Sequence, residues 1–104
     1  MKVFLKSDRN NLNASGEYSL EDGSVVVFAG SLLSANVSNS RTFRGRQSIL
    51  SSREGVVVNN ILQKDVLFKS PSTAANFVTG TSSNGNRLWK TAEGTPIGKL
   101  SKGV

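Results

Sequence analysis

The chain has 104 residues, which suits one domain spanning 1–104, and its formal net charge is +6. It contains no Cys and no His, which excludes disulfides, thiolate or imidazole metal sites and catalysis by Ser-His or Cys-His pairs. No stretch approaches the ~20 apolar residues of a membrane span, and the first residues lack a signal-peptide run, so we expect a cytoplasmic protein with no membrane partner.

The first third of the chain predicts short strands separated by polar turns. The apolar residues 3–5 predict a first strand, and residues 7–16 are polar and turn-like. Alternation in residues 17–20 predicts a half-buried strand. Residues 24–31 contain an unbroken β-branched run and form the strongest predicted strand, with both faces covered. Residues 16–31 together therefore predict a hairpin.

The middle of the chain predicts a helix followed by short strands. Residues 43–53 carry apolar or long side chains near helical spacing, and Gly55 lies close to the expected end of this helix. Residues 56–58 and 61–62 are apolar and fit either two short strands or one irregular segment. A further short strand is predicted at residues 66–68.

The segment that begins at Ser70 carries the clearest helix signal. The Ser70 hydroxyl can accept an amide hydrogen bond from the first turn, and Pro71 suits the first helical position. Gly80 is placed to end the helix in a left-handed conformation. Ala74, Ala75, Phe77 and Val78 provide its apolar face.

The last quarter of the chain predicts a tight turn and two short strands. Asn84-Gly85 is a turn pair, residues 87–90 alternate as a strand does, and residues 97–100 predict a final strand. The whole pattern predicts an α+β domain with a small, mostly antiparallel sheet and two helices.

Positive charge is concentrated in the predicted helix around residue 47. No acidic residue interrupts the segment 41–53, and on a helix Arg46 and Arg53 would share one face. A basic patch is typical of nucleic-acid-binding proteins, although a solvated surface gives the same composition. The arginines of this segment are Arg41, Arg44, Arg46 and Arg53.

Two further features concern phosphate binding. The helix that starts at Pro71 offers free amides that can hold a phosphate, and Ser70 and Ser72 could add hydroxyl contacts, although simple capping explains them equally. Residues 80–85 contain the two glycines of a phosphate loop, but Asn86-Arg87 follows where Lys and Ser or Thr are required. The loop is also expected to precede a strand, so we reject a nucleotide site.

Trp89 and the acidic pair Glu21-Asp22 each have a structural explanation beside a functional one. Trp89, the single tryptophan, fits either the core or a base-stacking contact. Glu21-Asp22 is the one pair of neighbouring acidic residues, and a turn before Gly23 explains it. We therefore expect no enzymatic activity and no cofactor.

One stretch resembles a known family. The residues 64–75 (KDVLFKSPSTAA), followed by Gly80, Asn84-Gly85 and Trp89-Lys90, resemble domain-of-unknown-function family 4357. The resemblance covers residues 3–100. It implies an accessory role, because the family is found with GIY-YIG nucleases and restriction-modification proteins and is similar to a methylase-associated module linked to recognising modified DNA.

These observations predict a non-catalytic accessory module that binds nucleic acid, expected to be DNA, and works with a nuclease or methylase. The alternative is a protein-docking or scaffold domain, which an exposed apolar patch would favour over a basic groove. The expected phosphate contacts are Arg44, Arg46, Lys69 and Lys90, and the expected polar contacts are Ser70, Ser72 and Asn84.

Overall fold

A computed structural model describes residues 1–38 and 44–100 of the chain. Strands pair in an antiparallel sheet of order β1-β2-β3-β6, and β4 and β5 form a separate two-stranded hairpin. The elements in chain order are β1 (Lys2–Ser7), β2 (Leu12–Tyr18), β3 (Val25–Val27), α1 (Arg46–Arg53), β4 (Val57–Val58), β5 (Ile61–Leu62), β6 (Val66–Phe68), α2 (Pro71–Thr79), α3 (Gly85–Leu88) and a 3-10 helix η1 (Ile97–Lys99).

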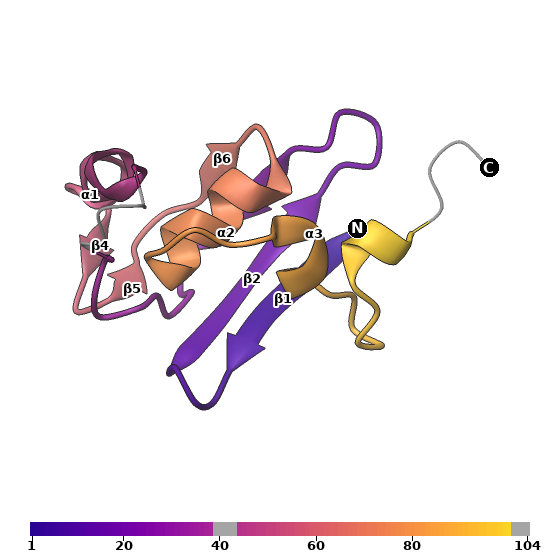
Figure 1. The fold of residues 1–104 in the computed structure, drawn as a ribbon, viewed down its shortest axis with the longest axis horizontal. Coiled ribbons are helices and arrows are strands. Elements are labelled where there is room, and N and C mark those ends of the chain that lie inside the picture. The colour runs from indigo at the N-terminus through magenta and orange to yellow at the C-terminus, as the bar shows by residue number, and fades with distance from the viewer. Residues whose placement is uncertain (39–43, 101–104) are drawn as a thin grey trace.

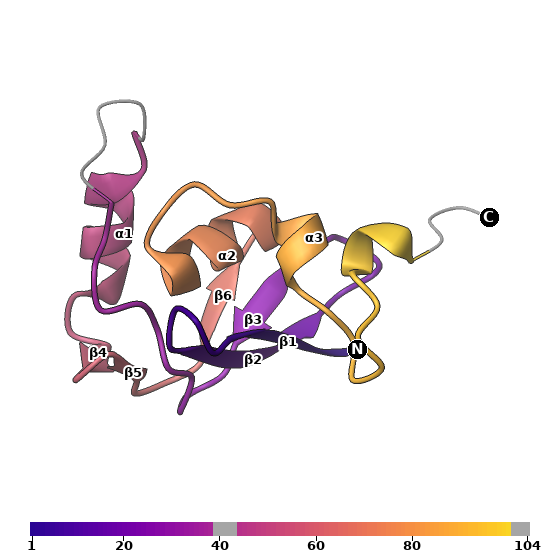
Figure 2. The same cartoon turned by 60° about the horizontal axis from the view of Figure 1, so that its bottom comes forward.

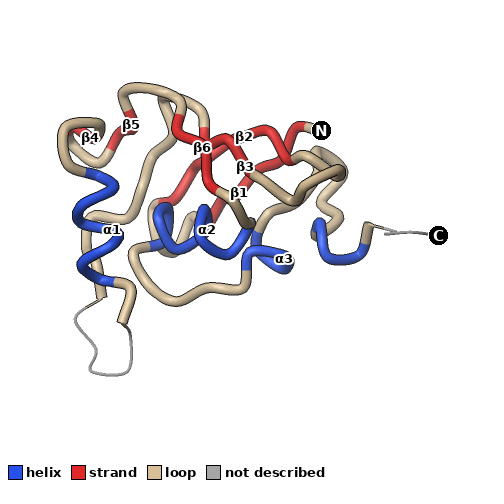
Figure 3. The backbone as a smooth tube through the Cα atoms, turned by 90° about the horizontal axis from the view of Figure 1, so that it is seen from above, coloured by secondary structure: helices blue, strands red, loops and turns tan. Residues whose placement is uncertain are grey.

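The domain has two layers, which confirms the α+β prediction. The helices form one layer and the strands the other (Figure 3). Helices α2 and α3 lie over one face of the main sheet, and no described helix covers the opposite face (Figure 2). Helix α1 lies beside the β4–β5 hairpin at one end, whereas the N-terminus of β1 lies near the other end (Figure 1).

The core fills the space between the sheet and α2. Alternate residues of β1 and β2 point into it, because side chains on a strand alternate between faces. Trp89, the largest fully buried side chain, is 0% exposed and therefore belongs to the core. The other central residues are Val3, Leu5, Ala14, Tyr18, Val25, Val27, Phe68, Ala74, Ala75, Phe77, Val78 and Ile97.

Helix α2 begins and ends as the sequence predicts. The Ser70 Oγ accepts a hydrogen bond from the Thr73 amide at 3.2 Å, and Pro71 occupies the first turn. Gly80 ends the helix with φ of 78°, a left-handed conformation that costs glycine little.

The predicted strands at 87–90 and 97–100 are wrong. Residues Gly85–Leu88 form the short helix α3, and the Asn84 side chain accepts from the Asn86 amide at 3.1 Å to start it. A single helical turn followed by an extended residue also gives the alternation that suggested a strand. Loop 80–85 thus precedes a helix, and residues 1–38 and 44–100 contain three α-helices where two are expected.

Other boundaries also differ from the prediction. β2 starts at Leu12, inside the segment predicted to be a turn, because its small core residues give a weak apolar signal. β3 ends at Val27 because the chain turns away from the sheet, and Gly30 adopts φ of 91°.

The predicted helix start at Phe43 lies outside the described residues. The two-strand alternative holds for β4–β5, with Asn59-Asn60 forming the positive-φ turn.

A substitution at Gly85 tests how tightly α3 packs on α2. A Cβ added at Gly85 would lie 2.1 Å from the carbonyl carbon and oxygen of Pro71. Because backbone must move to admit it, Gly85→Ala should lower the free energy of unfolding by about 1–3 kcal/mol in urea denaturation. The exposed Asn86→Ala on the same helix is the control and should change it by less than ~0.5 kcal/mol. Equal stability of both variants would contradict this packing.

Candidate nucleic-acid interface

The serines and the asparagine predicted to contact nucleic acid lie together at the start of α2. The Ser70 hydroxyl caps α2, and the Ser72 Oγ accepts from the Gly85 amide at 3.1 Å. Asn84 caps α3 next to them. Ser70 thus acts as the helix cap that the sequence suggests, whereas Ser72 joins α2 to the first residue of α3. Lys69 precedes them and is exposed.

The arginines of the basic segment lie at the other end of the domain. Arg44 and Arg46 are exposed at the beginning of α1, and an Arg46 Nη1 donates to the Val37 carbonyl. Helix α1 is separated from α3 and from the N-terminus by the length of α2 (Figures 1 and 2). The predicted contacts are thus distributed over more than one surface.

Arg53, in the same segment, has a structural role. Its Nε and Nη2 donate to the Phe77 carbonyl at 3.1 and 2.7 Å, and its Nη1 donates to the Ser34 carbonyl at 2.9 Å. These bonds satisfy a carbonyl at the C-terminal end of α2, where a cation also complements the helix dipole. Burial lowers the pKa of Arg53, which nevertheless remains protonated in water.

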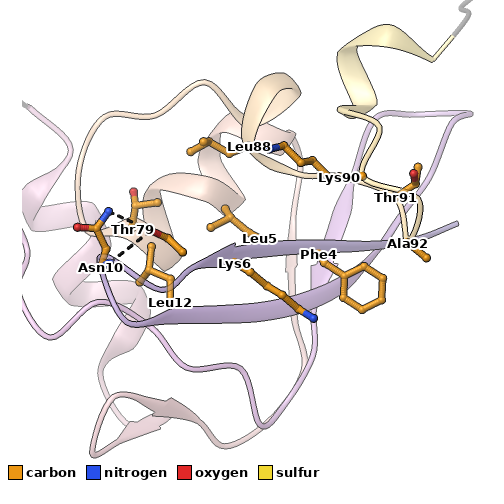
Figure 4. Close-up of a pocket in the computed structure, with 12 residues that line it drawn as sticks. Phe4, Leu5, Lys6, Asn10, Leu12, Thr79, Leu88, Lys90, Thr91 and Ala92 are labelled. Atoms are coloured by element: carbon orange, nitrogen blue, oxygen red, sulfur yellow. Dashed lines mark hydrogen bonds between the residues drawn. The ribbon is translucent and has the colours of Figure 1, made fainter.

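Lys90 is joined to β1 at the edge of the sheet by its backbone. The Phe4 amide donates to the Lys90 carbonyl at 2.7 Å, and the Lys90 amide donates back to the Phe4 carbonyl at 2.9 Å. The ammonium groups of Lys2 and Lys6 lie 6.0 and 5.1 Å from the centre of the Phe4 ring. We call Lys2, Phe4 and Lys6 the Phe4 cluster, and the side chain of Lys90 points away from the Phe4 ring, toward Leu88 (Figure 4).

An open cleft of about 540 Å³ runs along β1 beside this cluster. Phe4 and Lys6 lie on its strand side, and Leu88 and Lys90 lie on the opposite side (Figure 4). Leu5 and Phe4 leave β1 in opposite directions, Leu5 toward the helices and Phe4 away from them (Figure 4). The cleft thus joins the helix side of the domain to the open face of the sheet.

The charges of the Phe4 cluster are not neutralised by neighbouring carboxylates. Within residues 1–38 and 44–100 no lysine or arginine side chain forms an ion pair. Glu17, which stands opposite Lys2 in the ladder, instead pairs with the N-terminal amine. The ammonium groups therefore remain available to an anionic ligand.

The acidic residues form no comparable site. Glu21 and Asp22 are exposed in the turn that the sequence predicts, and the hydrogen bond from the Ser24 amide lowers the pKa of Asp22. The Asp65 Oδ1 accepts from the Ala29 amide at 2.8 Å, outside the cleft. Among the described residues no group of three acidic, His or Cys side chains could hold a metal ion.

Sequence reasoning missed Lys2, Phe4 and Lys6. Their signal was present, because Lys2-Val3-Phe4-Leu5-Lys6 alternates in a way that puts both lysines and Phe4 on one face. The apolar centre of this run predicts only a first strand. The bridge to Lys90 joins residues far apart in the chain and has no local signal.

Fold and site define a small basic α+β domain whose main sheet keeps one face free of described helices. The family model described as Domain of unknown function (DUF4357) matches residues 4–101, and the chain belongs to this family. No curated protein and no solved structure matches the chain. None of the helices in the described part of the chain is long and apolar enough to cross a membrane.

The role assigned to Arg53 predicts a stability loss. Arg53→Met keeps most of the side-chain length but leaves carbonyls of α2 and Ser34 without their donor. The free energy of unfolding should fall by about 2 kcal/mol in urea denaturation. Arg87→Met, at an exposed arginine with no hydrogen bond to a described residue, should change it by less than ~0.5 kcal/mol. If Arg53→Met were as stable as Arg87→Met, the structural role assigned to Arg53 would be wrong.

Proposed function

We propose that this domain is a non-catalytic accessory module that binds nucleic acid, with DNA as the expected ligand. The observation that carries the proposal is the Phe4 cluster, in which the ammonium groups of Lys2 and Lys6 lie beside the ring of Phe4 at the edge of the sheet. Regularly spaced phosphates are the anions that such a group of lysines fits best.

The chemistry of the surroundings supports a binding role. The cleft beside the cluster is lined by lysine, hydroxyl, amide and apolar groups, and it contains no carboxylate. Lysine ammonium groups contact phosphates as point charges and do not require a fixed geometry. Such a surface can bind a backbone without acting on it.

The accessory role is supported by the resemblance of the chain to a family found beside nucleases and restriction-modification proteins. A module of this kind would hold DNA for a catalytic partner. The docking alternative has less support, because the most exposed large apolar residues come from separate segments: Leu20, Val58 and Leu67.

The main test is the salt dependence of DNA binding. A Lys2→Gln/Lys6→Gln variant should show a log-log salt slope that is smaller by about 0.9 for each lost phosphate contact on duplex DNA. Fluorescence anisotropy with a labelled oligonucleotide at several salt concentrations measures this slope. Lys64→Gln, at an exposed lysine before β6, is the charge control and should keep the wild-type slope. Absence of binding by the wild-type domain at low salt would overturn the proposal in favour of protein docking.

The same titration tests the two arginines next to α1. Sequence reasoning assigns phosphate contacts to Arg44 and Arg46, so Arg44→Gln/Arg46→Gln should also reduce the slope by about 0.9 for each contact. A reduced slope would extend the interface to the α1 end of the domain. An unchanged slope would exclude both arginines and leave the Phe4 cluster as the contact surface.

A further inference from the structure

Two phenylalanines, Phe4 and Phe28, lie outside the core on the open side of the main sheet. By contrast, Phe68 of β6 and Phe77 of α2 pack against each other in the core, with ring centres 4.8 Å apart. Phe4 and Phe28 are half-buried and belong neither to the core nor to the partly buried residues packed against it. Their rings therefore contribute apolar surface that the fold does not fully bury.

The strand register aligns these two residues in one row. Phe4 stands opposite Ser15 in the β1–β2 ladder, and its backbone polar groups point the other way, toward Lys90. Ser15 in turn uses its carbonyl to accept from the Phe28 amide at 2.9 Å. Opposite residues of an antiparallel ladder share a face, so Phe4, Ser15 and Phe28 lie on the same side of the sheet.

The alternation of buried and half-buried residues along β3 also places Phe28 on the open face. Val25 and Val27 are buried in the core, whereas Val26 is only half-buried. Phe28 follows as the next residue in this alternation and falls with Val26 on the open face. No described helix lies over that face (Figure 2).

The row has the composition and spacing of a base-stacking surface. Phe4 and Phe28 are two strand spacings apart, about 9.5 Å between backbones, and the small Ser15 stands between them. Single-strand-binding sheets stack successive bases on aromatic side chains in this way, with cations alongside for the phosphates. Here Lys2 and Lys6 flank Phe4.

We propose that the open face of the sheet binds single-stranded nucleic acid, with unpaired bases stacked on Phe4 and Phe28 and phosphates held by Lys2 and Lys6. This rests on the proposed nucleic-acid-binding function and specifies its substrate. A base inside a duplex hides its ring face from a side chain, and an unpaired base exposes it. The face should therefore prefer single strands to duplex of the same sequence.

The test compares three labelled ligands by fluorescence anisotropy: a single strand of about ten nucleotides, the matching duplex, and the same strand with abasic sites. Phe4→Leu and Phe28→Leu should each bind the intact single strand roughly 5- to 100-fold more weakly than wild type. Their affinity for the duplex and for the abasic strand should stay at the wild-type level, because the phosphates and the lysines are unchanged.

Two further variants keep the result interpretable. Phe4→Tyr retains an aromatic ring and should retain single-strand affinity, and unchanged duplex affinity of Phe4→Leu shows that its loss does not come from misfolding. Val58→Ala removes an exposed apolar side chain of the separate β4–β5 hairpin and should have no effect.

The outcomes separate this inference from the broader proposal. Salt-dependent binding by wild type with unchanged single-strand affinity in both leucine variants would overturn base stacking and leave nucleic-acid binding in place. Equal wild-type affinity for the intact and the abasic strand would do the same. Failure of wild type to bind any of the three ligands would overturn both proposals.

Discussion

The burial of Trp89 is the constraint on which most of the domain depends. Its indole nitrogen donates to the Pro71 carbonyl at 3.1 Å, and its backbone amide donates to the Gly85 carbonyl at 3.1 Å. The Ile97 amide then donates to the Trp89 carbonyl at 2.9 Å. One residue thus joins the start of α2, the helix α3 and the 3-10 helix η1. A buried indole needs such a partner because an unpaired N–H in the core is costly.

The same residue determines where the candidate site lies. Since Trp89 is fixed in the core, the next residue must leave it, and Lys90 emerges beside Phe4 at the edge of β1. The bridge to Lys90 covers one position of an edge strand that would otherwise present free amides and carbonyls. The burial of Trp89 therefore also places the backbone of Lys90 against Phe4, at the edge of the sheet where the candidate cleft lies.

Helix α2 separates the two basic ends of the domain. Its C-terminal carbonyls are satisfied by Arg53, so one member of the basic segment is withdrawn from the surface to complete the fold. Arg44 and Arg46 stay exposed beside α1, while the Phe4 cluster lies on β1 at the edge of the main sheet. The net charge of +6 thus combines structural and free cations, and composition does not distinguish them.

The sequence by itself determined the α+β class, the helix α2 with its Ser70 cap and Gly80 end, and the basic character of the surface. These depend on local chemistry: a hydroxyl one residue before the helix, a glycine after it, and the count of charges. The short helix α3 and the 3-10 turn were misjudged because segments of three or four residues have almost no periodicity. Tertiary structure alone decided which cations lie together and that Phe4 and Phe28 share a row, because both depend on pairing between strands and on the distant bridge to Lys90, which no local pattern encodes.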